Sequence, residues 1–195
     1  MKKILILILI LASLSSTSNA QEPHSFTMAY SIAMPASGLS DYIGSTSFRG
    51  FNLEYNRRIE SGWAFGLESG WNSFHERTES KVYTEGTMSI SGIQYRNTIA
   101  VPIIGGAKYH FNSDSKIKPY GGIGLGTIYF DRNTDFGLYR ISTDTWQFTY
   151  RPEFGIKYEY QPGQGILFGV KYYGATGNDD LDGQSYFALN IGIVL

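Results

Sequence analysis

The sequence Ser185-Tyr-Phe-Ala-Leu-Asn-Ile-Gly-Ile-Val-Leu195 alternates between two kinds of side chain over its whole length. The side chains at every second position from residue 187 are large and apolar. Those at the positions between them are mixed and include the small residues Ala188 and Gly192. Side chains of a β-strand point alternately to its two faces, so this period predicts a strand with one strongly apolar face. The apolar row consists of Phe187, Leu189, Ile191, Ile193 and Leu195.

The other end of the chain has the features of an export signal. Lys2 and Lys3 precede an apolar run at residues 4–12, and a small-x-small pattern follows at Ser18, Asn19 and Ala20. The run is too short to cross a bilayer as a helix and fits the core of a cleaved signal peptide. We therefore predict a signal peptide at residues 1–20 and a single domain at residues 21–195.

The composition excludes several classes of function. The chain has 16 basic and 17 acidic residues, which leaves no basic field to attract nucleic acid. It has no cysteine, so disulfides, thiol catalysis and cysteine metal sites are excluded, and we expect no cofactor. Its 23 glycines, 15 tyrosines and 12 phenylalanines are typical of closely packed strands with aromatic ends.

Eight segments with a two-residue period are separated by turn residues. They are residues 25–34, 47–57, 62–73, 95–110, 117–130, 146–160, 165–173 and 185–195. Short connectors at 58–61, 111–116 and 161–164 alternate with longer polar ones at 35–46, 74–94, 131–145 and 174–184. This alternation predicts an all-β, eight-stranded antiparallel up-and-down transmembrane β-barrel with both termini in the periplasm.

The alternation within each segment also sorts charged residues onto one face. Aromatic residues such as Trp63 and Trp146 lie at both ends of the apolar face. They favour a membrane barrel whose apolar face contacts lipid over a soluble barrel whose apolar face points inward. The charges then face a narrow lumen, where opposite signs pair because an isolated charge is too costly. We expect a packed lumen network; the alternative is a narrow conducting path gated by Arg151 and a facing Glu. The predicted network is Glu54, Glu68, Arg96, Lys108, Lys118, Arg151, Glu153, Lys157, Glu159 and Lys171.

Two neighbouring segments carry a family resemblance. They contain Val101-Pro102-Ile103, Gly106-Ala107-Lys108-Tyr109-His110-Phe111 and Lys118-Pro119-Tyr120-Gly121-Gly122-Ile123-Gly124-Leu125-Gly126. This hairpin resembles that of small bacterial outer-membrane β-barrels, the group similar to the OmpA transmembrane domain and OmpX. The resemblance implies location in the bacterial outer membrane, contact with its lipid, and insertion by the assembly machinery, which reads the C-terminal strand. That strand usually ends in an aromatic residue, whereas this chain ends in Leu195.

A calcium site is a weaker hypothesis. Asn178, Asp180, Asp182 and Gly183 match the first, third, fifth and sixth positions of a calcium loop, but the twelfth position is Leu189 in place of a Glu. Glycines within this segment are typical of a solvated turn. We therefore favour an acidic hairpin tip and no metal.

Three classes of function stay open at this point. Ser73, His75 and Glu76 are a compact Ser, His and acid set, but with no evident oxyanion donors they are weak evidence for a lipid-modifying enzyme. A narrow channel for small solutes is the first alternative, and the lipid-modifying enzyme is the second. We favour a non-enzymatic structural or surface-interaction protein whose four outer loops bind an extracellular protein or surface ligand, because loops on a rigid scaffold tolerate variation.

Overall fold

The computed structural model describes residues 24–59, 62–85, 88–111, 115–136 and 139–195. The signal peptide predicted at residues 1–20 lies outside the described residues. The strands are β1 His24–Ala36, β2 Gly50–Arg58, β3 Trp63–Glu85, β4 Met88–His110, β5 Ile117–Phe136, β6 Tyr139–Gln161, β7 Gln164–Ala175 and β8 Ser185–Val194. One short helix, α2, spans Leu39–Tyr42.

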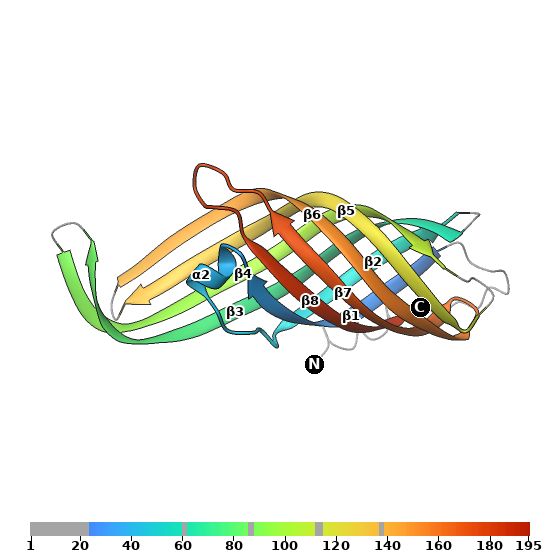
Figure 1. The fold of residues 1–195 in the computed structure, drawn as a ribbon, viewed down its shortest axis with the longest axis horizontal. Coiled ribbons are helices and arrows are strands. Elements are labelled where there is room, and N and C mark those ends of the chain that lie inside the picture. Colours follow the sequence, from blue (N-terminus) through green and yellow to red (C-terminus); the bar gives the residue numbers. More distant parts are fainter. Residues whose placement is uncertain (1–23, 60–61, 86–87, 112–114, 137–138) are drawn as a thin grey trace, which may run out of the picture.

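The strands form a closed barrel in sequence order, and each is antiparallel to its neighbours (Figure 1). The predicted fold class is confirmed. The barrel closes where β8 pairs with β1, with Phe187 opposite Met34 and Ile193 opposite Met28. The last residue continues this ladder, since the Leu195 N–H donates to the Phe26 carbonyl at 2.8 Å. Closure leaves no unpaired edge along the body of the barrel.

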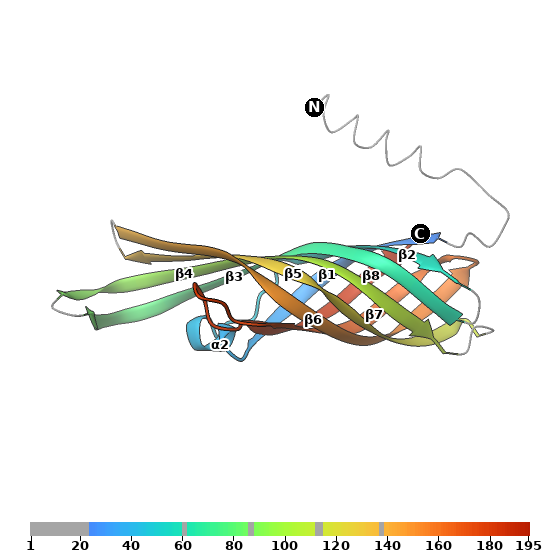
Figure 2. The same ribbon diagram turned by 90° about the horizontal axis from the view of Figure 1, so that it is seen from above.

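Four strands are longer than the sequence pattern indicates. Residues 74–94 and 131–145, which we expected to be loops, mostly continue β3, β4, β5 and β6 as paired strands. Figures 1 and 2 show these strands projecting well beyond the others. The sequence of the projecting part is largely polar and lacks the continuous apolar row that identifies a half-buried strand. The backbone ladder alone continues the pairing, with one register shift between Thr78 and Lys81.

The connector between β1 and β2 differs from expectation in another way. We predicted an irregular loop at residues 35–46, and it contains helix α2. Four residues are too few to produce a helical period in the sequence. Leu39 and Ile43 are fully buried, and the helix lies at the end of the barrel from which β3–β6 project (Figure 1).

The outer face of the barrel is apolar. Leu67, Phe154 and the predicted apolar row of β8 are all exposed. Aromatic side chains meet at both ends of this face: Trp63 packs on Tyr109 at one end, and Tyr129 packs on Trp146 at the other. Within the described part of the chain, no helix combines the length and apolar character needed to cross a membrane.

Candidate functional site

Six charged side chains meet at the centre of the barrel interior. They occupy inward positions of five strands, and none is more than 5% exposed. The set contains equal numbers of acids and bases, so its formal charges cancel. Cancellation matters here because an unpaired ion in such a buried position would be strongly destabilising. The six are Glu54, Glu68, Lys108, Arg151, Glu153 and Lys171.

The two lysines join acids that lie on different strands. Lys108 Nζ on β4 is 2.5 Å from Glu54 Oε1 on β2 and 3.1 Å from Glu153 Oε2 on β6. Lys171 Nζ on β7 lies 3.2 Å from Glu54 Oε2 and 2.8 Å from Glu68 Oε2. The network therefore connects opposite walls of the barrel across its lumen.

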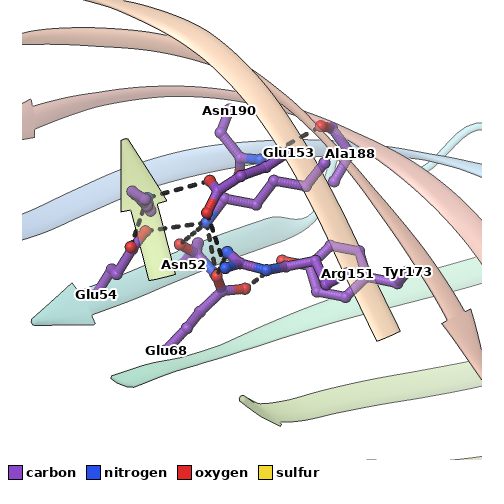
Figure 3. A network of polar contacts seen from close by, with 10 residues as sticks. Asn52, Glu54, Glu68, Arg151, Glu153, Tyr173, Ala188 and Asn190 are labelled. Atoms are coloured by element: carbon purple, nitrogen blue, oxygen red, sulfur yellow. Dashed lines mark hydrogen bonds and ion pairs between the residues drawn. The ribbon is translucent and has the colours of Figure 1, made fainter. Parts of the chain in front are cut away.

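Arg151 completes this network (Figure 3). Its guanidinium forms an ion pair with Glu68, and its Nη2 lies 2.8 Å from Glu153 Oε1. The Tyr173 hydroxyl donates to Glu68 as well. The guanidinium fits because Gly124 faces it: a Cβ there would lie 3.0 Å from Nη2 of Arg151.

The other four predicted lumen charges lie elsewhere. Lys118 and Glu159 form a separate ion pair toward the short turns, and Lys157 donates to a turn carbonyl there. Arg96 lies at the opposite end, where its Nη1 donates to the Tyr42 carbonyl at 2.8 Å. The described structure thus divides the ten residues into a central group of six, a group of three at one end and Arg96 at the other.

An apolar cluster fills the interior beside helix α2, and we did not predict it. Its inward-facing members interrupt the polar face of their strands: Ile104 on β4, and Ile128 and Phe130 on β5. The adjacent apolar pair Ile103-Ile104, with one residue on each face, is the sequence signal that would have revealed it. The cluster also includes Ala33, Leu39, Tyr42, Ile43, Phe74, Ala100, Tyr173, Ala175, Tyr186 and Ala188, with Leu181 packed against it.

The connector at residues 37–49, which contains α2, lies across the end of the barrel from which β3–β6 project. Polar contacts hold it there. The Glu76 carboxylate on β3 accepts hydrogen bonds from the backbone N–H groups of Gly44, at 2.5 Å, and Ser45, at 3.3 Å. The Tyr42 hydroxyl donates to the Asn133 carbonyl on β5 at 3.0 Å. Together with the buried Leu39 and Ile43, these contacts make the connector a lid on the interior.

The Ser, His and acid set does not assemble into a catalytic arrangement. His75 Nδ1 is 2.6 Å from Asn97 Oδ1 on the outer face of the projecting sheet, and its ring stacks on Tyr95. Glu76 points to the inner face, where it binds the lid. Among the described residues, no contact joins Ser73, His75 and Glu76.

The calcium hypothesis involves a turn between β7 and β8. The Asn178 Oδ1 atom accepts hydrogen bonds from the backbone N–H groups of Asp180, at 3.2 Å, and Leu181, at 3.0 Å. The amide therefore organises the turn, and Asp182 contributes its carbonyl to Gln147 and Gln184. No group of three His, Asp or Glu in the described ranges is placed to hold a metal ion.

Comparison with known proteins identifies the family. The family model described as "Outer membrane protein beta-barrel domain" matches residues 4–193. Neisserial surface protein A is 16% identical, with a TM-score of 0.59 over 89% of this chain and 96% of that chain. Ail, the attachment invasion locus protein of Yersinia pestis, solved with the heparin analogue sucrose octasulfate, is 15% identical, with a TM-score of 0.52 over 88% and 97%.

No curated protein matches the chain in the sequence comparison. The two solved structures show a shared fold, and the family model covers nearly the whole sequence. The apolar outer face is accordingly the surface that contacts membrane lipid. The chain belongs to the outer-membrane protein β-barrel domain family and is a small eight-stranded barrel of the bacterial outer membrane.

Proposed function

We propose that this protein is a non-enzymatic surface-binding barrel that presents the projecting part of β3–β6 outside the cell, with both termini in the periplasm. The observation that carries this proposal is the length of the paired sheet. β5 and β6 pair as far as Phe136 and Tyr139, whereas β7 joins β6 only from Thr149. The extra paired length is not needed to close the barrel. A rigid sheet that extends outside the membrane is instead suited to presenting a binding surface.

The free edge of β6 gives this sheet a way to bind an extended polypeptide. The Trp146 and Phe148 carbonyls accept hydrogen bonds from Asn178 and Thr176 on the β7 side. By the two-residue period, the N–H and C=O of Ser142 also point to that side, where the described structure has no neighbouring strand. Unpaired backbone groups of this kind accept an added strand.

The corresponding edge of β3 is less available. The Ser47 hydroxyl donates to the Ser73 carbonyl at 2.5 Å, and the Ser73 N–H donates to the Arg49 carbonyl at 3.0 Å. Further along, the register shift between Thr78 and Lys81 interrupts the ladder. Covered and irregular edges resist strand addition, which leaves β6 as the binding edge.

The filled interior supports a binding role over a channel. The central charge network spans the lumen, and the apolar cluster and the lid occupy the space beyond it. A water-filled path would require both layers to move. We also propose that the apolar row of β8 is the strand read by the assembly machinery during insertion.

The proposal is tested with two substitutions at one edge position. Ser142→Pro removes the edge-facing N–H, and Ser142→Ala keeps it. Cells displaying each variant are assayed for binding to immobilised extracellular proteins, with heat-dependent gel mobility as the folding control. We expect wild type and Ser142→Ala to bind a common partner and Ser142→Pro to lose it. Equal binding by a folded Ser142→Pro variant, or a stable open conductance of the wild type in planar bilayers, would contradict the proposal.

A further inference from the structure

We infer that Arg96 and Arg132, held against the ring of Tyr42 at the outer mouth, form a binding site for one sulfate or phosphate ester group of an extracellular glycan. The inference deepens the surface-binding role proposed above and rests on its orientation of the barrel. It concerns a different part of the surface from the free edge of β6.

Both guanidinium groups are positioned by the same tyrosine ring. The guanidinium carbon of Arg132 lies 3.4 Å from the Tyr42 ring centroid, and that of Arg96 lies 5.0 Å away. The ring itself is fixed, because the Tyr42 hydroxyl bonds to the Asn133 carbonyl and to Thr134, and its residue is buried in the lid. Two cations are therefore held near each other on a rigid support.

No described carboxylate forms an ion pair with either cation. Glu76 is opposite Arg96 in the β3–β4 register, but its carboxylate is bound to the lid N–H groups of Gly44 and Ser45. The described hydrogen bonds of the Arg96 side chain go to neutral groups, the Tyr42 carbonyl at 2.8 Å and Gln94 Oε1 at 3.2 Å. With no described carboxylate in ion-pair contact with either guanidinium group, an anion placed beside the two arginines would be attracted to both.

The outer face of the same sheet provides a contrast. There Arg140 is satisfied by Asp135, with its Nε 2.5 Å from Oδ1 and its Nη2 3.2 Å from Oδ2. This sheet therefore pairs an exposed arginine bidentately on one face. On the other face it holds two partly buried arginines that form no ion pair with a described carboxylate. The planar N–H fork of arginine matches the oxygens of sulfate and phosphate esters, which makes such oxyanions the ligand class that fits.

The position of the site favours a ligand from outside the cell. Arg132 lies three residues beyond Tyr129 on β5, which is about 10 Å further along the strand. It also lies on the inner face of the projecting sheet, against the lid, whereas membrane lipids surround the apolar outer face of the barrel itself. Phosphate groups of the membrane's own lipopolysaccharide are the other source of the same chemistry, and the experiment separates the two.

The test uses the full chain in nanodiscs of zwitterionic phosphatidylcholine, with sucrose octasulfate as a soluble polysulfate probe. Binding is measured by calorimetry and by the side-chain Nε–Hε NMR signals of the arginines. We expect shifts at Arg96 and Arg132 and at least about tenfold weaker binding for Arg132→Gln, from the loss of charge-assisted hydrogen bonds. Arg96→Gln should have a similar effect.

The matched controls are Arg77→Gln and Arg49→Gln, which remove exposed arginines from the same end of the barrel. They should change the affinity less than about twofold, since they only alter screened long-range attraction. Arg132→Gln is the decisive variant, because Arg132 contacts the Tyr42 ring alone among its described interactions, whereas Arg96 also holds the lid.

Wild-type affinity for the probe in Arg132→Gln would overturn the proposed site. Equal losses of affinity in all four arginine variants would also overturn it. Nanodiscs that contain lipopolysaccharide decide the source: unchanged probe binding supports an extracellular glycan, and loss of probe binding overturns that assignment. The Ser142→Pro experiment is independent of this one. Loss of the anion site with an intact β6 edge effect would leave the proposed function in place.

Discussion

Arg151 on β6 and Glu68 on β3 form an ion pair across the barrel lumen, and both side chains are 2% exposed. Neither residue stands alone, because Arg151 also binds Glu153 and Glu68 also binds Lys171. Removal of one member therefore leaves an excess charge inside a buried network. The first prediction follows from that imbalance.

We expect Arg151→Met to lower the free energy of unfolding by about 3–5 kcal/mol, the usual cost of breaking a buried ion pair from one side. The measurement is urea-induced unfolding in lipid vesicles, followed by tryptophan fluorescence. Arg140→Gln is the control: Arg140 also pairs with an acid, but its side chain is 65% exposed, so little change is expected. Comparable stability of the two variants would show that the lumen network is solvated.

The second prediction concerns the space beside the Arg151 guanidinium. A Cβ on Gly124 would lie 2.5 Å from Ile104 Cγ2 and 3.0 Å from Arg151 Nη2, so Gly124→Ala should destabilise the barrel by about 1–3 kcal/mol through overpacking. Gly121→Ala on the same strand is the control, since its nearest atoms would be 3.8 Å away. The same unfolding assay applies, and equal stability of both variants would disprove the packing argument.

The third prediction concerns how the lid is held. Glu76→Gln weakens the acceptor for the N–H groups of Gly44 and Ser45, so these amides should exchange with deuterium faster while the barrel ladder exchanges as before. Hydrogen exchange read by NMR measures this directly. Glu79→Gln, an exposed acid on the same strand, should leave the lid amides unchanged. Unaltered exchange in Glu76→Gln would mean that the Glu76 contacts do not hold the lid.

The fourth prediction is a pH effect in the projecting hairpin. A hydrogen bond from Arg140 holds the pKa of Asp135 below its ordinary value of 3.8. A lowered pKa means that the pair stabilises the folded hairpin above the ordinary value and that this contribution disappears as the pH falls through the folded pKa. Arg140→Gln should raise the pKa of Asp135 in a carboxyl-carbon NMR titration. An unshifted titration would show that the pair does not form.

The sequence predicted the barrel because every strand within the membrane needs apolar side chains on its outer face. Residues such as Leu67, Phe154 and Ile191 must all meet hydrocarbon, so each strand within the membrane carries the same two-residue period. The projecting parts of β3–β6 meet no such requirement on either face. Their ends at Glu85 and Phe136 depend on backbone pairing, which leaves no apolar row to detect.

For the interior, too, the sequence predicts which residues face inward but not which of them meet. That Glu54, Glu68 and Arg151 face inward follows from alternation along each strand. Which charge meets which depends on the register between strands far apart in the sequence, which placed Lys108 beside Glu54 and kept Arg96 apart at the mouth.

By itself, the sequence determined the number of strands, their antiparallel order and the apolar outer face, because these follow from local alternation and from turns between neighbours. Only the tertiary structure decided that residues 39–43 enter the barrel and that Tyr42 meets Arg96 and Arg132. Those contacts join segments separated by more than fifty residues along the chain. No local sequence pattern predicts these contacts, because they form only when the barrel closes and brings distant segments together in its interior.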